Sequence, residues 1–350
     1  MVEGLLAEIE ARNNFFEGNQ QIETLYFGGG TPSLLEEKQI GKLIDRLQST
    51  FDIAPGAEIT LEANPDDLDA KKLRALASTG INRLSIGLQS FAEADLQLLN
   101  RSHNAMQSGD AVKRAQDMGF ENLTIDLIYG IPGSGMEQWQ ANVREAISLE
   151  VPHISAYSLT VEEKTALHYQ VSKSEIVLEP DAQHVAQYLE LGNLLDAAGI
   201  EQYELSNFAK SGFRSRHNSA YWKGLPYLGL GPSAHSFKDN QRFWNISNNA
   251  AYLNKTNSKQ STIANSETLS PNEQLNEYLM TQLRIVEGLD LRMMQSRWGF
   301  DILKRENESI QHAIKQGWMV QSNSHLHLTR TGFMVSDAII SDLFQVPERD

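Results

Sequence analysis

Residues that could bind a charged or polar ligand recur where the sequence predicts that strands end. The β-rich run 22–27 stops at Gly28, Gly29 and Gly30, and Thr31 follows them. Consecutive glycines carry no Cβ, so their backbone N–H groups can approach a ligand closely and can adopt positive φ angles. The alternative is a tight turn between a strand and a helix, without a ligand.

Two carboxylates belong to strands that are otherwise apolar. Glu62 lies near the end of the predicted strand 58–63, and a buried carboxylate is costly unless it meets a cation or several donors. We expect Glu62 to bind an ammonium group, although it could instead cap the next helix. Asp126 lies between apolar neighbours in the strand 122–129, so it should point toward the axis of a barrel. A fixed acceptor there suits a hydroxyl such as that of a ribose.

Two further polar side chains have a structural and a functional interpretation. Gln89 ends the predicted strand 83–89 and could satisfy loop backbone or bind a ligand. Arg101, in the run LNRSHN, could be a cation near the end of a helix. Beside Glu62 and Asp126 it could instead hold a substrate carboxylate through a bidentate pair. The residues alone leave both questions open.

These side chains need a scaffold that brings the ends of strands together. The apolar periodicity predicts strands in alternation with helices. The strands are 22–27, 58–63, 83–89, 122–129 and 153–160, and the helices are 34–49, 69–79, 107–118, 136–149 and 181–198. Such an alternation requires parallel strands and right-handed crossovers. Because nearly every strand ends in a potential ligand residue, we predict an α/β fold with a full or partial β/α barrel rather than an open sheet.

Composition narrows the class of protein. The chain has 350 residues, of which 41% are hydrophobic, a net charge of −15 and no cysteine. The negative charge argues against binding to nucleic acid or to an acidic membrane surface. The sequence shows neither a long apolar run nor the pattern of a signal peptide after Met1, which predicts that no transmembrane segment is present. We therefore expect a cytoplasmic protein.

A short segment beyond the predicted barrel combines two histidines with aromatic residues. His217, Tyr221 and Trp222 belong to the run SRHNSAYW, and His235 belongs to the glycine-containing run YLGLGPSAHSF. A nitrogen ligand beside flat apolar surface is what an iron tetrapyrrole would need. The commoner role of a lone histidine is a hydrogen bond to backbone. Composition and spacing do not decide between the two.

The last part of the chain predicts a second, smaller unit. Residues 1–254 would form the barrel with its extension, and the polar segment 255–270 would form a linker. Residues 271–350 predict helices, a hairpin over WMVQ and HLHLT, and a final amphipathic helix. This order suggests a winged-helix-like α+β domain. Its basic residues are diluted by acids, so we expect a packing or lid role rather than DNA binding.

Six sequence runs, taken together and in this order, resemble the motifs of a known family. They are YFGGGTPS, LEANPD, RLSIGLQSF, LNRSH, IDLIYGIPG and LGLGPSAHSF, and together they resemble the oxygen-independent coproporphyrinogen III oxidase-like family of radical S-adenosylmethionine (SAM) proteins. The resemblance covers roughly residues 3–345 and implies a partial barrel of the TIM type. It implies that Gly29 and Glu62 bind one SAM. It also implies that a second SAM site or the substrate space is lined by Gly30, Thr31, Gln89, Arg101 and Asp126.

Within that family, the H-N-x-x-Y-W run resembles the heme chaperone branch, HemW. This resemblance implies a protein that binds heme and SAM and delivers heme to membrane-associated acceptor proteins, with His217 or His235 as the iron ligand. The alternative is the branch that oxidatively decarboxylates the propionates of coproporphyrinogen III. For that activity, Arg101, Arg214 and Arg216 are a thin supply of cations for four carboxylates.

The sequence departs from the family in one respect. Radical SAM chemistry needs a 4Fe-4S cluster held by the three thiolates of a C-x-x-x-C-x-x-C loop, and this chain has no cysteine. In the family that loop precedes the helix with which this chain begins, so we expect the loop and the first strand to lie upstream of Met1. A truncation or a misplaced start would explain why the chain begins with a helix and why the first strand with its loop is missing. As written, the chain should not perform radical chemistry, and whether it is an enzyme stays open.

Overall fold

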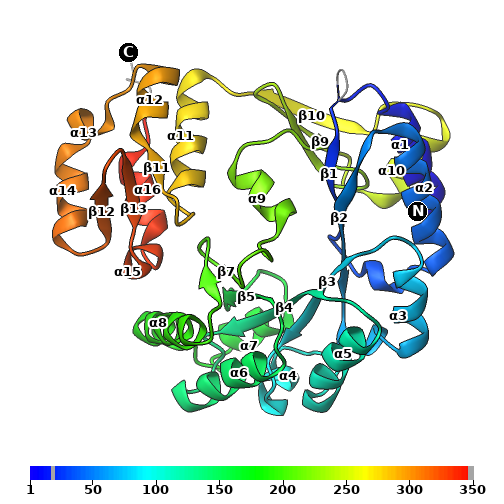
Figure 1. Ribbon diagram of the computed structural model, residues 1–350, viewed down its shortest axis with the longest axis horizontal. Helices are drawn as coiled ribbons and strands as arrows, with labels where there is room; N and C mark the ends of the chain where they lie inside the picture. The colour runs from blue at the N-terminus through cyan, green and yellow to red at the C-terminus, as the bar shows by residue number, and fades with distance from the viewer. Residues whose placement is uncertain (17–19, 346–350) are drawn as a thin grey trace.

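A curved, largely parallel sheet forms the centre of the first part of the molecule. The computed structural model describes residues 1–16 and 20–345. The parallel strands follow one another in chain order and are β1 (Ile22–Phe27), β2 (Ile53–Ala63), β3 (Arg83–Gln89), β4 (Asn122–Tyr129) and β5 (His153–Ser158). β7 (Asn207–Ala209) then pairs antiparallel with β5, and β6 (Glu201–Gln202) pairs with β7. Since β1 and β6 are the two edges of the sheet, the barrel is partial (Figure 1).

The strands direct apolar side chains outward and polar side chains into the lumen. In β4, Leu123, Ile125 and Leu127 are fully buried in the main apolar core, whereas Thr124 and Asp126 line a cavity inside the barrel. This alternation follows from the two-residue period of a strand. Each buried aliphatic side chain contributes about 1.5–3 kcal/mol of hydrophobic stabilisation. The strands therefore stabilise the barrel with one face and present chemistry with the other.

Helices cover the outer face of the sheet, and those between β1 and β5 connect the parallel strands, as the sequence predicts (Figure 1). They are α1 (Val2–Ala11), α2 (Glu37–Thr50), α3 (Ala70–Ala77), α4 (Glu93–Leu98), α5 (Ala105–Asp117), α6 (Met136–Ser148), α7 (Ala166–Ser172) and α8 (Asp181–Ala197). The predicted partial β/α barrel is confirmed.

Beyond the barrel, one helix and a second sheet form an extension. α9 (Arg216–Trp222) lies at the open side of the barrel in Figure 1. Next come β8 (His235–Lys238), β9 (Gln241–Asn245), α10 (Asn249–Asn257) and β10 (Ile263–Thr268), in which β9 pairs with both other strands.

The predicted linker over 255–270 is wrong, because this segment contains the end of α10 and the whole of β10. All but the first residue of β10 are exposed, so the strand has no apolar face that a sequence could reveal. Its hydrogen bonds to β9 hold it in place.

Glu8 joins α1 to this extension. Its buried carboxylate accepts hydrogen bonds from the Gly231 N–H (2.8 Å), the Asn245 amide (2.7 Å), the Tyr252 hydroxyl (2.6 Å) and the Thr262 hydroxyl (2.6 Å). These four donors satisfy a side chain that would be costly to bury without partners. The start of the described chain is therefore fixed against the 231–262 region.

The C-terminal unit consists of helices around a small antiparallel sheet. Its elements are α11 (Pro271–Gln282), β11 (Leu289–Asp290), α12 (Leu291–Trp298), α13 (Ile302–Arg305), α14 (Asn307–Lys315), β12 (Met319–Ser322), β13 (His325–Leu328), α15 (Arg330–Phe333) and α16 (Ser336–Leu343). The predicted hairpin is β12 and β13, and β11 adds a third strand. Where the sequence predicts a single final helix, the structure has two, α15 and α16. This unit shares one continuous apolar core with the barrel.

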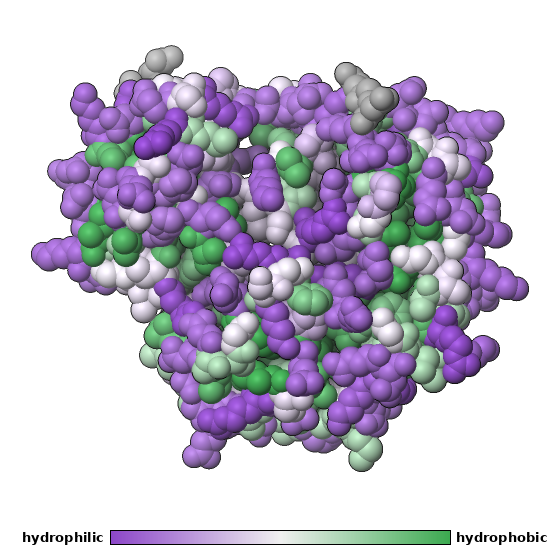
Figure 2. Space-filling view, viewed as in Figure 1, coloured by the Kyte–Doolittle hydropathy of each residue, from purple (hydrophilic) through white to green (hydrophobic). Residues whose placement is uncertain are grey.

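The face of the molecule in Figure 2 agrees with the polar composition of the chain. The face in Figure 2 is mostly hydrophilic, and its hydrophobic residues form small separate groups. Among the described residues, no helix is both long enough and apolar enough to span a bilayer.

Candidate cofactor site

A polar cavity of about 290 Å³ lies inside the barrel. Side chains from the inner faces of neighbouring strands line it, among them Thr60, Glu62, Ser85, Thr124, Asp126 and His153. The Thr60 hydroxyl and His153 Nδ1 are buried and have no hydrogen-bond partner among the described residues. Burial keeps the pKa of His153 well below its usual value, so its ring is neutral. Thr60 and His153 therefore offer the cavity two uncharged groups that a ligand could hydrogen-bond.

The glycine turn after β1 packs directly against Glu62. A Cβ on Gly28 would lie 2.5 Å from the Tyr26 ring and 2.7 Å from Glu62 Oε1, so only glycine fits. Gly29 adopts a positive φ of 81° and donates its N–H to Glu62 Oε2 at 3.2 Å. By contrast, a Cβ on Gly29 or Gly30 would meet no atom of residues 1–16 or 20–345 within 4 Å. One side of the turn is thus fixed to Glu62, and the other side is open.

Glu62 retains the capacity to bind a cation. Its Oε1 accepts the Tyr26 hydroxyl at 2.7 Å and its Oε2 accepts the Gly29 N–H. An ionised carboxylate has about four lone-pair sites, so these two bonds orient it without saturating it. The arrangement fits the predicted ammonium-binding role.

Asp126 lies in the same cavity with an unusual pKa. Burial, with a smaller contribution from the charge of Glu62, raises the pKa of Asp126 to about 7. Hydrogen bonds from Ser155 and Ser85 and the charge of Arg101 act in the opposite direction. Near neutral pH this carboxyl group is present in both protonation states, so it can donate to or accept from a ligand hydroxyl.

The side chains of Arg101 and Gln89 both lie close to Gly87. The Arg101 guanidinium donates to Asn64 Oδ1 at 2.7 Å and to the Gly87 carbonyl at 3.1 Å. Its Nε is buried and finds no partner in the part of the chain that the structure describes. Burial lowers the pKa of Arg101, and the charges of Asp66 and Asp126 counteract this. Gln89 has a positive φ of 70°. A buried N–H without an acceptor is a group that a bound ligand could satisfy.

The predicted SAM residues therefore come from four adjacent strands. Gly29, Glu62, Gln89 and Asp126 belong to or follow β1, β2, β3 and β4, which are neighbours in the sheet. Gly30 and Thr31 continue the same turn, and Thr31 precedes the 3-10 turn Pro32–Leu34. The chemistry of this set fits a ligand that carries an ammonium group, hydroxyls and a carboxylate.

His217 is held on three sides. Its ring stacks on Tyr26 with centroids 4.5 Å apart and planes 16° from parallel. Its Nδ1 lies 3.0 Å from Thr24 Oγ1, and its Nε2 lies 3.1 Å from the Tyr221 hydroxyl. Burial lowers the pKa of His217 to about 4, although Glu58 raises it slightly. The imidazole is therefore neutral and has one N–H and one lone pair.

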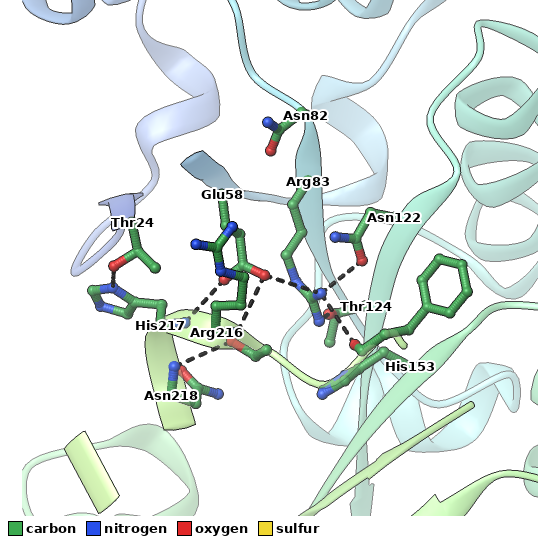
Figure 3. A network of polar contacts seen from close by, with 12 residues as sticks. Thr24, Glu58, Asn82, Arg83, Asn122, Thr124, His153, Arg216, His217 and Asn218 are labelled. Atoms are coloured by element: carbon green, nitrogen blue, oxygen red, sulfur yellow. Dashed lines mark hydrogen bonds and ion pairs between the residues drawn. The ribbon is translucent and has the colours of Figure 1, made fainter. Parts of the chain in front are cut away.

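A buried ion pair fixes the helix that carries His217. Glu58 accepts the backbone N–H of Arg216 at 3.2 Å and that of His217 at 3.0 Å, and it lies 3.5 Å from Arg83 (Figure 3). Arg83 also donates to Asn122 at 2.6 Å and to Thr124 at 2.7 Å. These contacts connect the first turn of α9 to three strands of the barrel.

The other predicted heme residues have different surroundings. His235 is exposed at the start of β8, and its ring stacks on Trp244 at 6.0 Å. Trp222 has a buried Nε1 without a partner among the described residues. Tyr221 is 42% exposed, so it covers His217 from the solvent side. The structure thus gives His217 contacts with Tyr26 and Tyr221 but gives His235 a separate aromatic partner.

Several residues of the site were not predicted from the sequence. Thr24 and Tyr26 share the inner face of β1, and Glu58 shares the inner face of β2 with Glu62. The two-residue alternation could have placed them on the polar face. Arg83 is only 1% exposed, and a cation at the start of an apolar strand is a signal of a buried partner.

Comparison with known proteins identifies the family. Residues 5–146 match the model of the Radical SAM superfamily, and residues 269–335 match that of the HemN C-terminal domain. The heme chaperone HemW of Bacillus subtilis is 32% identical over 92% of this chain and 85% of that protein. HemW of Lactococcus lactis is 31% identical over 97% and 87%. The chain belongs to the HemW family. The resemblance inferred from the six sequence runs and from HNSAYW is confirmed.

A solved structure agrees with the fold of this HemW-family chain. Coproporphyrinogen III oxidase (HemN) from Escherichia coli superposes with a TM-score of 0.82 and 22% identity, over 98% of this chain and 82% of that one. At this level of identity the match supports the architecture alone.

The iron–sulfur cluster of the superfamily does not fit the residues present. The sequence has no cysteine, and the described residues contain no group of three or more histidines and acidic residues placed to hold a metal ion. No chemical step is therefore assigned to a cluster in this chain.

Proposed function

We propose that this HemW-family chain is a heme chaperone that binds both heme and SAM. The glycine turn and Glu62 would hold the methionine part of SAM, with the ammonium group on Glu62. Gln89, Arg101 and Asp126 would bind the remaining polar groups of SAM or of a second SAM. His217 would ligate heme iron, with Tyr221 and Trp222 as flat apolar surface and His235 as the second candidate ligand.

One observation carries this proposal. The His217 ring stacks on Tyr26, and the Tyr26 hydroxyl binds Glu62, which in turn binds the glycine turn. The candidate heme ligand and the candidate SAM site therefore share one aromatic side chain, although His217 is 193 residues from Thr24 in the sequence. A ligand bound at either site would therefore contact a residue that is connected to the other site through Tyr26.

The alternative function, oxidative decarboxylation of coproporphyrinogen III, finds less support. The substrate has four carboxylates that need cations. Arg214 pairs with Glu287 at 2.6 Å, and Arg216 pairs with Glu23 and donates to the Gly56 carbonyl. Two of the three candidate arginines are thus already occupied.

Hemin titration followed at the Soret band tests the heme site. The wild type should give a saturable, red-shifted band that is lost in His217→Ala and retained in His312→Ala, which removes an exposed histidine of the C-terminal unit. A band lost only in His235→Ala would move the ligand to β8. A band indifferent to both His217 and His235 would refute the heme assignment.

Isothermal titration with SAM tests the second site. Glu62→Gln removes the negative charge while keeping the shape of the side chain. We expect the affinity for SAM to fall by about tenfold or more, because a charge-assisted bond contributes about 1.5–3 kcal/mol. Unchanged affinity would remove Glu62 from the site.

We also propose that the heme acceptors are membrane-associated proteins and that the chain works in the cytoplasm. The proposal on the acceptors can be tested by following, by absorption spectroscopy, the transfer of heme from the loaded chain to an apo heme protein reconstituted in vesicles. Heme that stays on the chain at every acceptor concentration would contradict it.

A further inference from the structure

The two ring nitrogens of His217 have unequal surroundings. Nδ1 faces Thr24 of β1, which belongs to the inner face of the barrel, at 3.0 Å. Nε2 faces the hydroxyl of Tyr221 at 3.1 Å, and Tyr221 is 42% exposed. Thr24 is half-buried and Tyr221 is exposed, so the Nε2 side is the one that opens more easily.

The rest of the His217 environment is rigid. Tyr26 stacks on the ring, and the carboxylate of Glu58 holds the backbone N–H of His217 itself. Glu58 is in turn buried against Arg83, with side-chain exposures of 4% and 2%. A ligand approaching His217 would find it far easier to displace Tyr221 than to move the imidazole.

Metal-binding histidines almost always donate their second ring N–H to an acceptor, which fixes the tautomer and the orientation of the ring. The Thr24 hydroxyl oxygen is placed to accept the Nδ1–H of a neutral imidazole. In that tautomer the lone pair is on Nε2, where the Tyr221 hydroxyl can donate to it. The same nitrogen that would bind iron is then protected by a phenol.

We propose that Thr24 is the positioning residue for a metal-ligating His217 and that the Tyr221 hydroxyl is a removable cap on Nε2. This inference rests on the proposed heme function. Nε2 of His217 would hold heme iron once the Tyr221 hydroxyl has moved away, and Thr24 would keep the proton on Nδ1. The two hydroxyl groups have opposite effects: that of Thr24 promotes ligation, whereas that of Tyr221 competes with it.

Hemin titrations of matched variants separate these roles. Thr24→Val keeps the shape but removes the acceptor, and the hemin affinity should fall by about 10- to 100-fold, as is typical for the loss of such a partner. Thr24→Ser restores the hydroxyl and should bind like the wild type. Tyr221→Phe keeps the ring but removes the competing hydroxyl, so the hemin affinity should rise by about three- to tenfold.

The outcomes distinguish the inference from the function on which it rests. If His217→Ala abolishes the Soret band but Thr24→Val and Tyr221→Phe both bind like the wild type, the inference is wrong and the heme assignment stands. A weaker band in Tyr221→Phe would make the phenol a supporting or ligating group rather than a cap. If His217→Ala binds like the wild type, both fail.

A second measurement needs neither heme nor a variant that might fail to fold. Long-range nitrogen–proton correlation spectra of the histidine-labelled, heme-free wild type report which ring nitrogen carries the proton. We expect His217 to be protonated at Nδ1 and unprotonated at Nε2. The reverse tautomer would overturn the positioning role of Thr24 directly.

Discussion

At the scale of single residues, the glycine run is not uniform. Gly28 packs against Tyr26 and Glu62, whereas Gly29 and Gly30 face open space. The first glycine is therefore needed for contact with the protein, and the other two leave room for a ligand. The three positions should differ in their tolerance of a methyl group for these reasons.

Gly28→Ala should disturb the SAM site. Its Cβ would push against the Tyr26 ring and the Glu62 carboxylate, and overpacking of this kind costs about 1–3 kcal/mol. We expect the affinity for SAM, measured by isothermal titration, to fall by roughly 5- to 100-fold.

The matched control is Gly41→Ala in α2, where the new Cβ meets no atom within 4 Å. It should leave the SAM affinity unchanged and raise the free energy of unfolding by up to about 1 kcal/mol. Equal SAM affinities for the Gly28 variant and this control would contradict the packing argument.

Asp126 should make stability depend on pH. Its pKa of about 7 in the folded protein lies above the unfolded value near 3.9, so the folded state prefers the neutral carboxyl. The associated stabilisation is complete below about pH 4 and is lost as the pH rises through 7. Asp126→Asn removes this dependence, and its free energy of unfolding relative to the wild type should increase from pH 5 to pH 8.

Urea unfolding of both proteins at several pH values measures this difference. A difference that is the same at pH 5 and pH 8 would show that Asp126 does not titrate in this range. Because the comparison is between two proteins that share Glu204, whose pKa burial also raises to about 7, the contribution of that residue cancels.

At the scale of elements, the Glu58–Arg83 pair holds α9 against the barrel. Glu58→Gln leaves the buried Arg83 charge without its counter-ion and weakens the acceptor for two N–H groups of α9. Breaking a buried pair typically costs about 3–5 kcal/mol. We expect a loss of this size in the free energy of unfolding, together with weaker hemin binding through His217.

The control for this prediction is the exposed pair Arg214–Glu287, whose side chains are 43% and 55% exposed. Glu287→Gln should change stability by less than about 1 kcal/mol. In the double variant Glu58→Gln/Arg83→Met, part of the lost stability should return, because no unpaired charge is buried. If the double variant instead loses as much stability as Glu58→Gln and Arg83→Met lose in sum, the two residues are not coupled.

The elements also show what a sequence can and cannot predict. The barrel strands and Glu62 and Asp126 were predictable, since carboxylates in apolar strands stand out against a clear two-residue period. β10 was not, because its exposed residues carry no periodic signal. Thr24 and Tyr26 were missed as neighbours of His217, since nothing local indicates a contact across 193 residues.

At the scale of the whole molecule, the barrel and the C-terminal unit share one core. The continuous apolar cluster includes Leu25 of β1 and Leu343 of α16, and backbone hydrogen bonds join Leu205 to Arg284 and Tyr203 to Val286. We expect a single cooperative thermal transition, with calorimetric and van't Hoff enthalpies that agree. Two resolved transitions in scanning calorimetry would show that the units unfold separately.

The contacts of Glu8 can be completed only late in the synthesis of this protein. One of its partners, Thr262, lies 254 residues further along the chain, and a ribosome adds about 5–20 residues per second. Roughly 13–50 s must therefore pass before α1 can acquire its last hydrogen bond. During that time α1 can already pack on α2, because Ile9 and Leu43 belong to one buried apolar cluster. The contact between α1 and the 231–262 region is therefore completed long after the helix itself has been made.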